Sequence, residues 1–230
     1  MNTVLSISIS IIVIAIALYI FGAIKNLKLL QTIPEAFIIP AAGTIILFLL
    51  RDFMPDSTHI VKITIISLTS ITISGLFAVI DKSRFAKFLN FLFFTISTFT
   101  WIDLYGSTFN IYPVYRITKI IAASIYLVLF IVLLVFIRKQ KKIFILFSLI
   151  SYLPAAFLNF CAIITVQRSR RGYAYILTAG TSILILFIIY QILRNAGKFK
   201  FSERIQRIIN TILLVSSEIL VITSGLLMIK

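Results

Sequence analysis

The chain has 230 residues, of which 60% are hydrophobic, and a formal net charge of +15. A soluble domain is closer to half apolar and must present a polar exterior, so this composition excludes an ordinary soluble protein. The Lys and Arg residues stand in short stretches between apolar runs, as in the loops of membrane proteins. No polar domain remains to present a basic face, which excludes nucleic acid as a partner.

Charged residues divide the sequence into apolar runs that predict transmembrane helices. A helix needs about 20 apolar residues to cross the hydrocarbon core, and lipid favours helices because each satisfies its own backbone polar groups. We therefore predict an all-α fold: a polytopic transmembrane helix bundle of eight spans, forming a single integral domain over residues 1–230 in the cell membrane. The predicted spans are Val4–Ala23, Ile33–Leu50, Ile60–Ile80, Phe88–Tyr105, Ile120–Ile137, Ile143–Val166, Tyr173–Leu193 and Ile208–Ile229.

The first two predicted spans differ in character. No Lys or Arg precedes Lys25, and the first apolar run is too long for a signal peptide, so we expect it to remain as a span. The second span contains Pro34 and Pro40, which makes it the candidate for a broken helix. Glu35 lies in its predicted first turn, where the helix dipole favours acids. We consider it a candidate catalytic acid, with a helix N-terminal acid as the structural alternative.

Spans three and four carry a serine stripe and an acid. Ser67, Ser70 and Ser74 have the spacing of one helical face, which favours close helix packing; Ser74 is also a candidate substrate-binding residue in a polar cavity. Asp103 stands between Trp101 and Tyr105, whose amphipathic rings favour the headgroup level. We consider Asp103 a candidate catalytic residue, the alternative being an ionised residue at the membrane interface.

Polar residues recur inside spans six and seven. Asn159 needs hydrogen-bond partners in lipid and should face the bundle interior. Gly180, with Thr181 and Ser182 after it, would allow close approach of a backbone or a ligand. Asn159, Thr181 and Ser182 are therefore candidate substrate-binding residues. Cys161 is the single cysteine, interpreted as a packing residue, and we predict neither a metal site nor a cofactor.

Glu218 is the deepest acid in the predicted bundle. It lies ten residues from the start of span eight and eleven from its end, near the membrane midplane. A charged acid there costs about 2.5–3.5 kcal/mol on insertion scales, so the side chain should face inward in its neutral form. A neutral carboxyl can donate a proton, which makes Glu218 the main candidate catalytic residue. The structural alternative is a hydrogen bond to a neighbouring helix.

The distribution of Lys and Arg predicts an orientation. The loops after spans one, three, five and seven hold 14 of the 22 Lys and Arg residues, and the other 8 lie in the remaining loops, at the C-terminus and, as Lys62, at the start of span three. Cytoplasmic loops are enriched in these residues, so the bias predicts cytoplasmic odd-numbered loops and outside termini.

The layout resembles that of the YhhN-type lysoplasmalogenases, which have eight short spans in a chain of this length. The segment Thr32-Ile33-Pro34 is similar to that family's Thr-Lys-Pro segment, with Ile33 in place of Lys. The resemblance implies a membrane lipid as partner. It also implies hydrolysis of the vinyl ether bond of lysoplasmalogens, which gives an aldehyde and a glycerophospho-alcohol.

The family's ionisable motif residues fall on other residue types in this chain. Its Gly-Asp acid falls near Ser74 or Leu76, its His near Ile96 and its second acid near Ile188, while Glu218 stands at the Gln position of its last segment. The reaction needs a proton for the vinyl carbon and a water to attack the adjacent cation. Glu218 is the deep acid that could deliver the proton.

Three functions remain open from the sequence. The first is a YhhN-like hydrolase acting on a lipid ether. The second is a non-catalytic membrane protein that binds lipid or a partner protein. The third is a small transporter that uses Glu218 as a protonation site, and transporters of this kind show broken helices or duplicated halves.

Overall fold

The computed structural model describes residues 2–50, 58–79, 83–106, 116–138, 143–169, 172–197 and 201–227. Over these ranges the chain forms eight helices and no strand: α1 (Asn2–Lys25), α2 (Lys28–Leu50), α3 (Thr58–Val79), α4 (Arg84–Gly106), α5 (Arg116–Arg138), α6 (Ile143–Ser169), α7 (Gly172–Asn195) and α8 (Glu203–Leu227). Seven of these helices are long and apolar enough to cross a membrane, and the described apolar segment of α5 is Ala123–Val135. The predicted all-α bundle is confirmed, and the chain is a multi-pass membrane protein.

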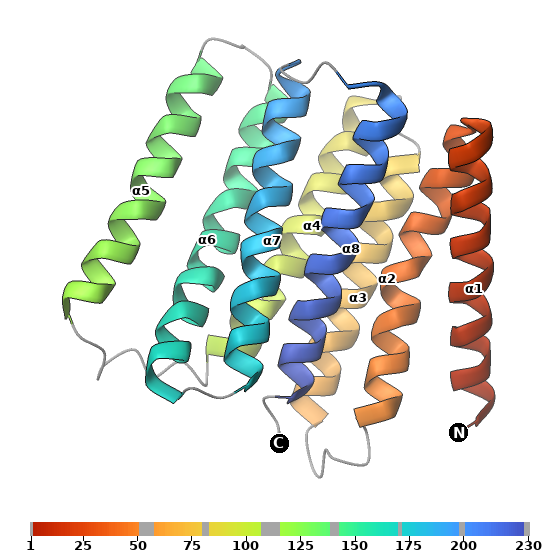
Figure 1. The fold of residues 1–230 in the computed structure, drawn as a ribbon, viewed down its shortest axis with the longest axis horizontal. Helices are drawn as coiled ribbons and strands as arrows, with labels where there is room; N and C mark the ends of the chain where they lie inside the picture. The colour runs from red at the N-terminus through yellow and green to blue at the C-terminus, as the bar shows by residue number, and fades with distance from the viewer. Residues whose placement is uncertain are drawn as a thin grey trace.

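Six helices close a ring, and two lie outside it (Figure 1). α2 packs on α3, α3 on α4, α4 on α6, α6 on α7, α7 on α8, and α8 returns to α2. α1 covers α2 at one side of the molecule, and α5 contacts α6 at the other. Both outer helices expose many Ile, Leu and Val side chains. These faces suit lipid tails, which are as apolar as the side chains themselves.

Small residues let the ring helices approach one another closely. A Cβ atom on Gly180 of α7 would lie 2.9 Å from the Leu220 Cβ and 3.2 Å from the Ser217 carbonyl oxygen of α8. The predicted close approach at Gly180 is confirmed, with α8 as the neighbour. On α3, the Ser67 hydroxyl lies 2.7 Å from the Ser97 hydroxyl of α4. This contact confirms the predicted packing role of the serine stripe.

The second helix begins earlier than predicted. A tight turn at Asn26, whose φ is 54°, ends α1 and allows α2 to begin at Lys28. α2 then continues through Pro34 and Pro40 without a break, so the broken-helix prediction is wrong. Glu35 lies two turns inside α2 and not in its first turn, so the helix dipole does not explain its position.

Candidate functional site

The ring encloses a cavity of about 600 Å³ at one end of the bundle. All six ring helices line it. Along α2 the lining extends from Lys28 to Ile39, which is about 16 Å of helix, or roughly half the hydrocarbon thickness. The volume falls within the range of about 300–1,000 Å³ that is usual for small-molecule sites.

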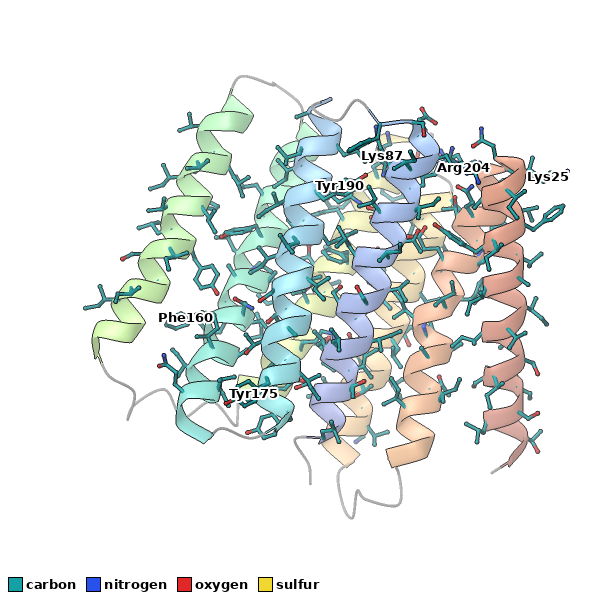
Figure 2. The ribbon with its side chains drawn as sticks, viewed as in Figure 1. Lys25, Lys87, Phe160, Tyr175, Tyr190 and Arg204 are labelled. Atoms are coloured by element: carbon teal, nitrogen blue, oxygen red, sulfur yellow. The ribbon has the colours of Figure 1, made fainter. Side chains whose placement is uncertain are left out.

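Charged residues form the mouth of the cavity. We define the mouth as Lys28, Lys87, Arg194, Glu203, Gln206 and Arg207. Lys28 and Glu203 are exposed, so the mouth opens to water. It lies at the end of the bundle where Figure 2 shows Lys25, Lys87 and Arg204. Four cations against one carboxylate give this end a positive potential that attracts anions.

Below the mouth the lining changes from polar to apolar. The middle zone carries hydrogen-bonding groups from Glu35, Ser74, Asn90, Ser151, Gln191 and Asn210. The floor is hydrocarbon, formed by Ile39, Ile71, Phe94, Phe187, Ile188 and Leu214, and the lining nearer the mouth also includes the apolar residues Ala36, Phe77, Ala78 and Phe91. The cavity is therefore amphipathic along its depth, which matches a molecule with a charged head and an apolar tail.

Glu35 is the acid of the middle zone. The Asn210 amide of α8 donates to its carboxyl at 3.5 Å, and the Gln191 amide of α7 donates in turn to the Asn210 carbonyl. The Thr211 hydroxyl also contacts the carboxyl, and Arg194 attracts its charge. Three helices thus hold Glu35 at the cavity wall, where a ligand can reach it.

Glu218 lies outside the cavity, one helical turn beyond Leu214 on α8. Its side chain is 1% exposed, which confirms the predicted inward orientation. The Trp101 indole of α4 interacts with its carboxyl without the geometry of a standard hydrogen bond. Glu218 is not part of the described cavity lining, so a molecule bound in that cavity would not touch it.

Asp103, the third predicted catalytic acid, lies apart from both Glu35 and Glu218. Asp103 is exposed near the end of α4 that lies away from the mouth. Its neighbours Trp101 and Tyr105 are buried, and the Tyr105 hydroxyl donates to the Val221 carbonyl at 2.9 Å. Both rings therefore face the bundle interior, and their predicted position at the headgroup level stays a prediction. The three acids do not form one site.

The predicted binding residues divide between two places. Ser74 lines the cavity, where its hydroxyl donates to the Asn90 carbonyl at 2.9 Å. Asn159 instead donates to the Thr181 hydroxyl at 2.7 Å and to the Ser182 hydroxyl at 3.0 Å. These three residues bind one another away from the described cavity lining. Their role in binding a substrate stays a prediction.

Several cavity residues escaped the sequence argument. Asn90, Gln191 and Asn210 are polar residues inside helices, so the criterion that selected Asn159 would also have found them. Arg207 was assigned to a loop because the eighth span was predicted to begin five residues after the observed start of α8. Arg194 was assigned to the same loop because the seventh span was predicted to end at Leu193, whereas α7 continues to Asn195. Whether all these residues meet at one cavity depends on the orientation of each helix about its own axis.

Comparisons with family models, with curated proteins and with solved structures gave no match. The function must therefore be argued from the site itself. The fold and the cavity define a class: a multi-pass helical membrane protein with an amphipathic cavity at its basic end.

Proposed function

We propose that this protein binds a single-chain lipid with a phosphate-bearing headgroup inside its cavity. The lipid chain lies on the apolar floor, and the headgroup lies at the mouth. The observation that carries this proposal is the gradient from four cations to six apolar side chains within one cavity of about 600 Å³. Each buried CH₂ group of the chain would contribute about 0.8 kcal/mol.

The resemblance to YhhN-type lysoplasmalogenases supports a lipid ether as the ligand. Ser74 and Ile188, near which that family carries acids, both line the cavity, and so does Thr32 of the segment that resembles Thr-Lys-Pro. These positions therefore fall at the amphipathic lining, whereas Leu76, Ile96 and Glu218, which the resemblance also singles out, are not part of the described lining. We place the mouth on the cytoplasmic side of the cell membrane, in keeping with the Lys and Arg bias.

Hydrolysis of a vinyl ether is the second candidate function, and the position of Glu35 favours it. A protonated Glu35 would transfer its proton to the vinyl carbon, and water would attack the adjacent cation. The resulting hemiacetal would lose its alcohol to give the aldehyde and the glycerophospho-alcohol. Glu35 takes the place of Glu218 in this scheme because it lines the cavity and Glu218 does not. No observation of this kind favours a transporter, since α2 is continuous.

Binding is tested with the purified chain in nanodiscs of neutral lipid and a radiolabelled lysoplasmalogen. The variant Ile188→Trp fills the floor and should abolish binding, whereas Leu186→Trp on the same helix faces outward, at 55% exposure, and should leave binding intact. Thermal unfolding confirms that both variants are folded. Absence of binding by the wild type, or equal binding by the two folded variants, would overturn the proposed site.

Hydrolysis is tested by the release of aldehyde in the same preparation. Release that is lost in Glu35→Gln and retained in Glu218→Gln would support Glu35 as the proton donor. The opposite pattern would return the role to Glu218. Binding without release by the wild type would leave a lipid-binding protein and refute the enzyme.

A further inference from the structure

Arg207 has an incomplete set of partners at the cavity mouth. Its side chain is 16% exposed, and its Nη2 atom lies 3.6 Å from the Glu203 carboxylate one turn earlier on α8. Its Nη1 atom is buried and has no hydrogen-bond partner. In the described part of the chain, no other charged side-chain atom is buried without a hydrogen-bond partner. A buried charged donor without an acceptor is costly, so an acceptor from a ligand would be favourable here.

The contact with Glu203 is weak enough to be exchanged. The Glu203 side chain is 88% exposed, and an exposed ion pair between residues one turn apart contributes only about 0.3–0.5 kcal/mol. Glu203 can turn into water at little cost, while Arg207 remains at the cavity wall. The ion pair therefore holds the guanidinium in place when no ligand is bound.

We propose that Arg207 binds the phosphate group of the ligand and exchanges Glu203 for it; this inference rests on the proposed lipid site. A guanidinium presents two N–H groups side by side, which match two phosphate oxygens. Lys28, Lys87 and Arg194 approach the same mouth from α2, α4 and α7. That much positive charge suits the phosphate of a lipid headgroup better than an uncharged headgroup.

The test measures equilibrium binding of 1-acylglycerol-3-phosphate to the full chain in nanodiscs of neutral lipid. Two further probes are a monoacylglycerol of the same chain length and glycerol 3-phosphate without a chain. Arg207→Gln should weaken binding of the phosphate lipid by about tenfold or more. Arg204→Gln is the matched control, because this substitution removes the same charge. Arg204 itself is exposed and is not part of the described lining. Glu203→Gln should tighten binding by about twofold.

The outcomes distinguish a failure of the role assigned to Arg207 from a failure of the proposed lipid site. If the phosphate lipid and the monoacylglycerol bind equally, or if Arg207→Gln behaves as Arg204→Gln does, the assignment of Arg207 is refuted while lipid binding stands. If glycerol 3-phosphate binds as tightly as the lipid, the ligand is a free phosphate compound and the lipid site fails. If neither lipid binds, both proposals fail. Arg207→Lys keeps the charge without the paired N–H groups, so an intermediate affinity would support the assignment if Arg207→Gln does not fold.

Discussion

Gly180 sets how closely α7 and α8 can pack, and replacing it by Ala should destabilise the bundle. The added Cβ atom would lie 2.9 Å from the Leu220 Cβ and 3.0 Å from the Val221 backbone nitrogen. Carbon atoms pack best at about 3.5–4.0 Å, so the two helices would have to separate by several tenths of an ångström. Overpacking of this kind costs about 1–3 kcal/mol. The better helix propensity of Ala returns about 1 kcal/mol, which leaves a net loss of up to about 2 kcal/mol.

Gly172 provides the control within the same helix. It is the first residue of α7, and a Cβ atom there would meet nothing within 4 Å. Gly172→Ala should therefore keep or slightly raise the free energy of unfolding, measured by SDS titration in mixed micelles. The two variants should differ by about 2 kcal/mol. Equal stabilities would show that α7 and α8 are not in the close contact described here.

Two further predictions concern hydrogen bonds between helices. Asn159→Leu removes the donor to Thr181 and Ser182 and the acceptor for the Tyr126 hydroxyl of α5. This substitution should lower the free energy of unfolding by about 1–3 kcal/mol and should speed amide hydrogen exchange in α5. Unchanged exchange would mean that this cluster does not hold α5. Asn210→Leu interrupts the contacts from Gln191 to Glu35; it should impair binding of the lysoplasmalogen with a smaller effect on stability, and a change in SDS unfolding alone would contradict a role in the site.

The fold could be predicted because its causes lie in the sequence itself. The hydrocarbon core demands long apolar helices, and each such run has charged residues at its ends. Inward burial of Glu218 followed from the cost of exposing an acid to lipid, and the structure confirms it. The same argument placed Asn159 in the interior, where it is buried.

The site could not be predicted in the same way, because it depends on helix ends and rotations. Two ring helices extend beyond the predicted apolar runs: α2 begins at Lys28 and α8 at Glu203. The charged residues at the starts of α2 and α8 were assigned to loops, although Lys28 and Arg207 lie within these helices and form part of the cavity mouth. Depth alone selected Glu218, but depth does not reveal whether a cavity reaches the residue.

The unsatisfied polar atoms distinguish the site from the scaffold. Three neutral atoms without a hydrogen bond of standard geometry, in Gln31, Thr64 and Trp101, are buried away from the described cavity lining. The charged one, Nη1 of Arg207, belongs to a residue of the mouth. An unpaired charge costs more than an unpaired neutral group, so a fold tolerates it where a ligand completes its hydrogen bonds. The position of Arg207 therefore supports the proposed ligand site at the mouth of the cavity over a site at the buried Glu218.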